Sequence, residues 1–420
     1  MRADHVPDHS VEPTFYAPVN HRQVPNTTDA IGAAVRKARW IADGYLTHVP
    51  EPVALQGARV LEVGPGTSCG PAVLMACRGA RVTVADRYLA PWRDEFHVPF
   101  FRALLEDVAG RAGEDPGPIR RLLEARAFVP EVCQRLASSA ETLSCLDASF
   151  DIVLSSAVFE HLEHVPHALS NLARVTAPGG TGIHQIHFGD HRDDDRQLEY
   201  LTLDNDLFWS CFEMSWGECG NRWRYTDFAD AFTHAGFDVV RTDPVFGASD
   251  AYLRDVRPRL HPDFSGRSDD ELRTLCAWMV CRRSSRAPRP ALSTRPGLAP
   301  TGTGEAYARR LVAPRRIVLY GAGAGGRFAF DILDRLGCAG SVVAVCDGDP
   351  ATRGRLVRQH RVTGFEDVPA SAYDTVIVAS QPGRHDIGER LAAAGLVPDP
   401  DLYAIGFVGG YARTAAEAAA

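Results

Sequence analysis

The 420-residue sequence lacks an excess of positive charge, paired cysteines and long apolar runs. Its 45 Lys and Arg residues against 53 Asp and Glu give a net charge of −8, which argues against a nucleic-acid backbone as partner. Its ten cysteines include no C-x-x-C pair, a pattern typical of a reduced protein. No apolar stretch is long enough to span a membrane, and residues 1–26 lack the apolar core of a signal peptide. We therefore expect a cytoplasmic protein without a membrane span.

The length favours two domains, and the composition suggests where they meet. We expect a flexible N-terminal tail at 1–27, a first domain at 28–282, a linker at 283–314, a smaller domain at 315–410 and a tail at 411–420. The linker is rich in Pro, Ser, Thr, Arg and Gly and shows no clean periodicity.

Strands alternate with helices in both domains, which predicts an α/β fold with doubly wound, Rossmann-like sheets. In the first domain we expect helices at 30–47, 166–177 and 226–235, a largely helical insertion at 88–132, and strands at 59–63, 81–85, 150–155, 181–188, 237–241 and 275–281. In the second we expect helices at 327–336 and 387–394, and strands at 316–320, 341–347, 374–380 and 402–405.

Each domain opens with a strand that leads into a glycine loop, but the two loops differ. The first carries Glu62 two residues before Gly64, with Gly66 next, and Asp86 ends the following strand. Glycines there let the backbone approach a ligand, and Asp86 is placed to accept both hydroxyls of a ribose. Glu62 would repel a pyrophosphate but suits a cationic ligand, which favours S-adenosylmethionine over NAD.

Beyond this loop the first domain resembles the class I S-adenosylmethionine-dependent methyltransferases over roughly residues 30–281. The similar segments are 60–67 (VLEVGPGT), 139–143 (SAETL), 150–161 (FDIVLSSAVFEH) and 174–180 (RVTAPGG). The resemblance implies that Glu62, Gly64, Gly66, Asp86, Ser139, Ala140 and Ser156 bind the cofactor. The sequence departs from the family where Ser68 replaces a third glycine, where Ser139 replaces an acid, and in the long 88–132 insertion.

The acceptor is expected past the fifth strand, where residues 184–191 (HQIHFGDH) enter a loop. A sugar hydroxyl needs a base, and histidine has a suitable pKa. We expect His191 as the base with Asp190 as its partner, His187 nearby, and His161 at the pocket border. With 221–228 (NRWRYTDF), this stretch resembles methyltransferases linked to polysaccharide biosynthesis and sugar modification. On that basis Arg222 and Arg224 are expected to hold an anionic part of the acceptor.

A metal site is an alternative for the same stretch. His184, His187, Asp190 and His191 are potential ligands for a divalent ion, although their spacing matches no zinc signature. We therefore assign no metal from the sequence, and we also expect His184 to be a histidine of the core.

The second domain carries Gly321, Gly323 and Gly326 in G-x-G-x-x-G spacing, and Asp347 follows at the end of the next strand. It resembles small Rossmann-like domains that bind nucleotide-sugars in some sugar acyltransferases, and C-terminal domains of some sugar methyltransferases. No Tyr-x-x-x-Lys dyad follows, so redox chemistry is not expected. Binding a nucleotide and acting as scaffold both remain open.

Together these features predict S-adenosylmethionine-dependent O-methylation of a sugar or nucleotide-sugar, in a monomer or an oligomer. A bifunctional enzyme with NAD(P)-dependent activity and a non-catalytic biosynthetic scaffold are the alternatives.

Overall fold

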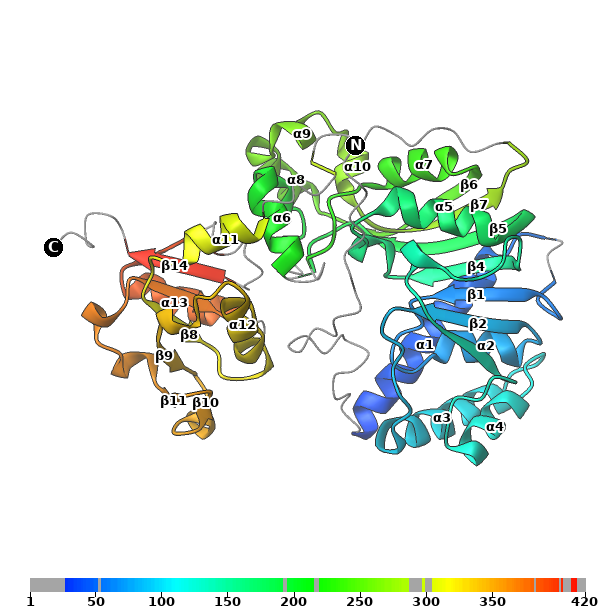
Figure 1. Ribbon diagram of the computed structural model, residues 1–420, viewed down its shortest axis with the longest axis horizontal. Coiled ribbons are helices and arrows are strands. Elements are labelled where there is room, and N and C mark those ends of the chain that lie inside the picture. Colours follow the sequence, from blue (N-terminus) through cyan, green and yellow to red (C-terminus); the bar gives the residue numbers. More distant parts are fainter. Residues whose placement is uncertain are drawn as a thin grey trace. The chain divides into compact units, whose positions relative to one another are not determined.

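The computed structural model divides the chain into two compact units (Figure 1). The residues that it describes are 27–51, 54–191, 195–214, 219–286, 297–298, 304–380, 383–399, 402 and 409–413. Within them, no helix is long and apolar enough to cross a membrane.

The first unit contains a seven-stranded sheet in the order β3-β2-β1-β4-β5-β7-β6, in which β7 is antiparallel to both neighbours. Its strands are β1 (Arg59–Val63), β2 (Arg81–Asp86), β3 (Cys133–Ala137), β4 (Phe150–Ser156), β5 (Thr176–His187), β6 (Phe237–Gly247) and β7 (Thr274–Arg283). Its helices are α1 (Thr28–His48), α2 (Gly70–Cys77), α3 (Asp94–Ala109), α4 (Gly117–Ala125), α5 (Val165–Val175), α6 (Asn205–Met214), α7 (Tyr225–His234), α8 (Asp250–Val256), α9 (Pro262–Ser265) and α10 (Asp269–Arg273).

The order of the strands places the expected site. From β1 the chain proceeds to β2 and β3 on one side, and it then returns to β4 on the other side of β1. The carboxyl ends of β1 and β4 therefore form the switch point, where open α/β sheets bind their ligands. Helices α1 to α4 and the strands that they cover share one apolar core.

The doubly wound α/β prediction is confirmed, as are the expected strands and the helical insertion, which holds α3 and α4. Strand β5 begins at Thr176, five residues earlier than expected, because residues 177–180 continue it past a register shift instead of forming a separate turn. Strand β3, helix α6 and helices α8 to α10 were not predicted.

The second unit contains another seven-stranded sheet, in the order β10-β11-β9-β8-β12-β14-β13. Its strands are β8 (Ile317–Tyr320), β9 (Val342–Cys346), β10 (Leu356–Val357), β11 (His360–Thr363), β12 (Thr375–Val378), β13 (Leu396–Pro398) and β14 (Gly409–Arg413). Its main helices are α12 (Ala324–Arg335) and α13 (Arg384–Ala393). Strands β11, β9, β8 and β12 are parallel, so the second unit is an α/β domain, as expected.

Two of the expected boundaries need correction. Helix α11 (Gly304–Val312) lies within the expected linker at 283–314, and β14 extends to Arg413, past the expected domain end at 410. Strand β14 pairs with β12 and β13, so residues 411–413 belong to the sheet and not to a tail. The strand expected at 402–405 falls almost wholly outside the described residues.

Helix α1 reaches the sheet through one glycine. A Cβ atom at Gly44 would lie 2.2 Å from Cζ2 of Trp278 in β7, closer than side chains pack. Tyr45 and His48 flank the same indole, with ring centroids 5.6 and 5.1 Å away. The missing side chain at Gly44 therefore lets α1 lie directly on Trp278.

We predict that Gly44→Ala lowers the free energy of unfolding by about 1–3 kcal/mol, because the new methyl group overpacks against the indole. The matched control is Gly32→Ala in the same helix, where the nearest atom is the flexible end of Arg36 at 3.3 Å. That change should stabilise by up to about 1 kcal/mol through helix propensity. Urea unfolding, monitored by tryptophan fluorescence, measures the free energy of unfolding of both variants. Equal changes in the two variants would contradict the packing argument.

Candidate functional site

The glycine loop after β1 has one residue used for packing and one open to a ligand. Gly64 and Gly66 both have positive φ, at 70° and 66°. A Cβ at Gly64 would lie 2.3 Å from Val158 Cγ2, just past β4, whereas a Cβ at Gly66 would meet nothing within 4 Å. Gly64 thus seats the loop against the end of β4, and Gly66 leaves backbone that a ligand can approach.

Glu62 lies beneath this loop and is buried, at 2 % exposure. The Tyr45 hydroxyl donates a hydrogen bond to its Oε1 at 2.9 Å, while Oε2 has no hydrogen-bond partner. Burial raises the pKa of Glu62 to about 8, against the opposing effect of the Tyr45 hydroxyl. A buried carboxylate of this kind would become easier to ionise if a cationic ligand bound beside it.

The other expected cofactor residues lie at the same edge of the sheet, at or after the carboxyl ends of β2, β3 and β4. Asp86 Oδ1 accepts a hydrogen bond from the Tyr88 N–H at 2.7 Å, which shapes the turn after β2. Ser139 accepts from the Glu141 N–H at 3.1 Å and caps the 3₁₀ turn Ala140–Thr142, in which Ala140 is buried. Ser156 donates to Gln185 Oε1 at 2.5 Å. Their roles in binding stay predictions.

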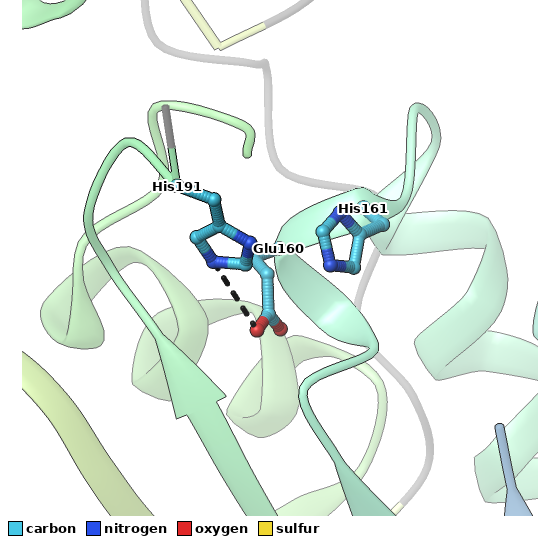
Figure 2. A group of neighbouring side chains, drawn as sticks. All are labelled: Glu160, His161 and His191. Atoms are coloured by element: carbon cyan, nitrogen blue, oxygen red, sulfur yellow. Dashed lines mark ion pairs between the residues drawn. The ribbon is translucent and has the colours of Figure 1, made fainter. Parts of the chain in front are cut away.

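Two imidazoles and a buried carboxylate meet at the carboxyl ends of β4 and β5 (Figure 2). Glu160 and His161 come from the 3₁₀ turn Phe159–His161, and His191 comes from the loop after β5. His191 Nε2 lies 3.9 Å from Glu160 Oε1, and the His161 and His191 ring centroids are 5.0 Å apart. The sequence analysis named both histidines but missed Glu160, although it directly precedes His161 in the 150–161 segment.

Burial sets the protonation of this group. It raises the pKa of Glu160 to about 7, although the neighbouring His161 moderates the rise. Burial, with help from His161 and His187, lowers the pKa of His191, so this imidazole is neutral at physiological pH. The pKa of the Glu160 carboxyl group is therefore closer to neutral than the pKa of His191.

The remaining histidines of this stretch separate into two environments. His187 lies beside the group, with its ring centroid 4.4 Å from that of His191 and its Nε2 2.9 Å from Gln197 Oε1. His184 is in the core, as expected: its Nδ1 lies 2.9 Å from Ser155 Oγ and its ring stacks on Phe232.

Asp190 is fully buried, and its pairing with His191 stays a prediction; the carboxylate recorded beside the His191 ring is Glu160. In the described residues, the side chains close enough to share an ion are Glu160, His161 and His191. Of the potential ligands named from the sequence, this group contains only His191.

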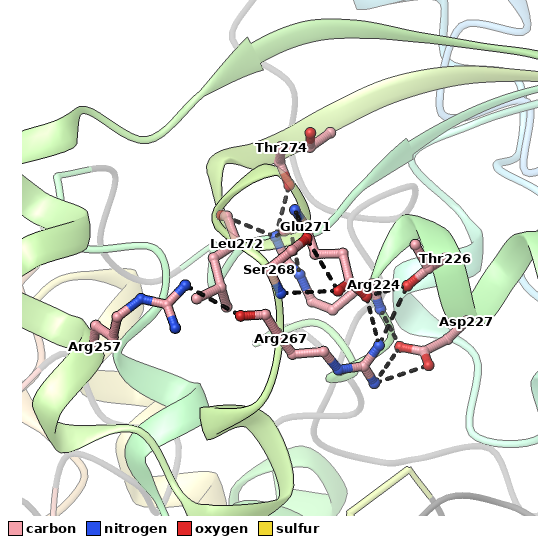
Figure 3. Close-up of polar contacts among 9 residues, drawn as sticks. All are labelled: Arg224, Thr226, Asp227, Arg257, Arg267, Ser268, Glu271, Leu272 and Thr274. Carbon is pink, nitrogen blue, oxygen red and sulfur yellow. Dashed lines mark hydrogen bonds and ion pairs between the residues drawn. The ribbon is translucent and has the colours of Figure 1, made fainter.

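The contact of Arg222 and Arg224 with the acceptor stays a prediction, and both side chains are fully buried. The Arg222 guanidinium donates to Asn205 Oδ1 and to the Leu203 and Asp204 carbonyls, and it lies over the Phe208 ring. The Arg224 guanidinium donates to the Glu271, Leu272 and Thr274 carbonyls (Figure 3). These contacts stabilise the fold.

The same segment instead positions the site. The Asn221 side chain donates to the Phe159 carbonyl at 2.8 Å and to the Leu162 carbonyl at 3.1 Å, and its N–H donates to the Glu160 carbonyl at 2.5 Å. Arg224 also donates to the Phe188 carbonyl, three residues before His191. We call Asn221 and Arg224 the clamp, since they fix the turn that carries Glu160 and the strand end that carries His191.

In the second unit, too, one glycine of the loop serves close packing and another leaves the backbone open. A Cβ at Gly326 would lie 2.0 Å from the Gly321 carbonyl oxygen, so Gly326 serves the close approach of loop and helix. A Cβ at Gly323, the N-cap of α12, would meet nothing within 4 Å. Asp347 Oδ2 accepts from the Ala322 N–H at 2.7 Å and so supports the loop.

Comparison with known proteins finds a family match within the first unit. Residues 37–242 match a family model described as a methyltransferase domain. A search of curated proteins found no match.

Solved structures with a similar fold include a candidate sarcosine dimethylglycine methyltransferase from Galdieria sulphuraria, at 16 % identity and a TM-score of 0.35, covering 65 % of this chain and 92 % of that one. An S-adenosylmethionine-dependent methyltransferase from Mesorhizobium loti is 13 % identical, with a TM-score of 0.33, and the match covers 59 % of this chain and 98 % of that one. A chain from a Haloferax volcanii complex of the Trm112 methyltransferase activator with a candidate methyltransferase is 16 % identical, with a TM-score of 0.34. The match covers 62 % of this chain and 96 % of that one. These low values do not define a substrate for this chain.

We predict that Asn221→Ala lowers methyl-transfer turnover by about 10- to 100-fold, because the Glu160 turn loses its donors and shifts. Cofactor affinity should change little. Asn171→Ala is the matched variant, since its side chain donates at 2.7 Å to the Glu141 carbonyl in the expected adenine segment. It should weaken cofactor binding more than turnover. Calorimetry measures the cofactor affinity and steady-state kinetics measures the turnover. If both variants change these two quantities in the same way, the positioning role of Asn221 is contradicted.

We also predict that stability depends on pH through Glu62. The folded pKa of about 8 lies above the ordinary 4.5, so the folded chain binds more protons and stability falls as pH rises across that window. The contribution is at most about 1.4 kcal/mol per pH unit. Glu62→Gln should therefore match the wild type near pH 5 and exceed its stability near pH 9 in chemical denaturation. If the difference in stability between Glu62→Gln and the wild type is the same at both pH values, Glu62 is already ionised in the folded protein at pH 5.

Proposed function

We propose that this S-adenosylmethionine-dependent methyltransferase methylates a hydroxyl group of a sugar or nucleotide-sugar. The observation that carries the proposal is the Glu160, His161 and His191 group at the carboxyl ends of β4 and β5, next to the cofactor loop at the switch point. A sugar hydroxyl is a weak nucleophile at neutral pH and needs a group that takes its proton. An amine acceptor would not need such a base once it is neutral.

Methyl transfer is an in-line displacement in which the acceptor oxygen forms a bond to the methyl carbon. The carbon–sulfur bond breaks, its electron pair stays on sulfur, and S-adenosylhomocysteine leaves. The hydroxyl proton passes to a base. Glu160, with a pKa of about 7, is better matched to that role than His191, whose pKa burial depresses. His191, His187 and Asp190 then orient the acceptor rather than accept its proton.

The second unit has features that suit the nucleotide part of such an acceptor. Gly323 leaves open backbone at the N-terminus of the 12-residue helix α12, where amide groups favour a phosphate. Asp347 follows β9 in the place where Rossmann-like folds bind a ribose. Among the described residues, we see no hydride-transfer dyad, so the NAD(P)-dependent alternative has less support.

A scaffold role for the second unit is the alternative, favoured by the close contacts at Gly321, Gly325 and Gly326. These glycines would be needed to fold the loop even without a ligand. Gly323 is the position that distinguishes the two roles.

The direct test incubates the full chain with methyl-labelled S-adenosylmethionine and a panel of nucleotide-sugars, free sugars and amines. Mass spectrometry then detects a methylated product and locates the methyl group. Oxygen methylation of a nucleotide-sugar supports the proposal, whereas methylation confined to amines refutes it. Consumption of NADH coupled to product formation would favour the bifunctional alternative.

For the second unit, we predict that Gly323→Val raises the acceptor KM at least about tenfold and leaves cofactor affinity unchanged. The side chain would occupy the space a phosphate needs, while the φ of −80° at this residue tolerates it. Gly326→Ala is the contrasting variant, because its Cβ collides with backbone and should lower the melting temperature. An unchanged KM in a well-folded Gly323→Val protein would assign the unit to scaffolding.

A further inference from the structure

We propose that Glu160, His161 and His191 form a binding site for one divalent transition-metal ion. One ligand atom from each residue lies within 4.8 Å of the other two. Figure 2 shows the two imidazole rings beside the carboxylate, one from its own turn and one from the loop after β5. The three residues thus come from two segments that the fold brings together at the switch-point edge.

The carboxylate supplies the independent observation. Glu160 is 1 % exposed, and neither of its oxygens has a hydrogen-bond partner. The nearest imidazole nitrogen, His191 Nε2, is 3.9 Å away, too far for a hydrogen bond. A buried carboxylate is unfavourable unless it is paired or coordinates a metal. An ion between Glu160 and the two rings would meet that requirement.

The ligand types narrow the choice of ion. Two imidazoles and one carboxylate suit Zn²⁺, Fe²⁺ or Mn²⁺, whereas Mg²⁺ and Ca²⁺ prefer all-oxygen sites. Three protein ligands leave at least one coordination position open for water or an acceptor oxygen. The clamp residue Asn221 holds the backbone on both sides of Glu160 and His161, which fixes the ligands in place.

The site gives the metal a task that deepens the proposed function and, in this respect alone, rests on it. A hydroxyl bound to the ion would lose its proton to solvent more readily, because the cation stabilises the alkoxide. In that case Glu160 serves as a ligand and the ion lowers the pKa of the acceptor hydroxyl. Metal binding itself requires neither S-adenosylmethionine nor an acceptor.

The test measures binding of Zn²⁺ to the tag-free full chain by calorimetry, and of Co²⁺ by visible absorption. We expect one equivalent per chain, with affinity reduced at least about tenfold in Glu160→Gln and in His191→Ala. The half-buried His161→Gln provides a third variant if the others melt early. The matched controls are Glu163→Gln and His164→Ala, a half-buried pair with a 3.8 Å separation, and they should leave the affinity unchanged.

The inference is overturned if the wild type binds no stoichiometric metal, or if site and control variants bind equally. Its failure is distinguishable from that of the proposed function. Metal binding without sugar methylation would refute only the proposed function, and sugar methylation by metal-free, chelator-treated protein would refute only the task given to the metal in the reaction.

Discussion

The Glu160, His161 and His191 group of the first unit depends on hydrogen bonds from the clamp to backbone carbonyls. Asn221 holds the turn that carries Glu160 and His161, and Arg224 holds the end of β5 before His191. Apolar packing alone could not hold the turn or the strand end in position, because their buried carbonyl groups need hydrogen-bond donors. Burial lowers the pKa of Arg224, yet several carbonyls satisfy its guanidinium, so the charge remains tolerable in the core.

Buried carboxylates mark both ends of the expected transfer path. Glu62 lies beneath the cofactor loop and Glu160 lies at the acceptor end, and each has at least one oxygen without a hydrogen-bond partner. Burial raises the pKa of both groups. Such groups destabilise a fold unless a ligand compensates for them, which is why they are informative about function. A cationic cofactor beside Glu62 and a metal ion beside Glu160 would each supply the missing charge.

The sequence was sufficient for the central strands of both sheets and for the glycine loops, because strand alternation and loop spacing are local properties. It was insufficient for Arg222 and Arg224. An arginine that binds a phosphate and one that binds buried carbonyls have the same sequence pattern. The tertiary contacts distinguish them, with residues 203–205 for Arg222 and with α10 and β7 for Arg224. Glu160 was missed for a related reason: its burial beside His191 depends on the loop after β5, 31 residues further along the chain. The one available signal was its place next to His161, directly after a strand.

The measurement that tests the account most directly is a crystal structure of the full chain with S-adenosylhomocysteine, the product that remains after transfer. The account predicts the ribose at Asp86, the backbone of Gly66 against the ligand, and the sulfur facing the Glu160, His161 and His191 group. A ligand bound elsewhere, or one whose sulfur points away from that group, would contradict it.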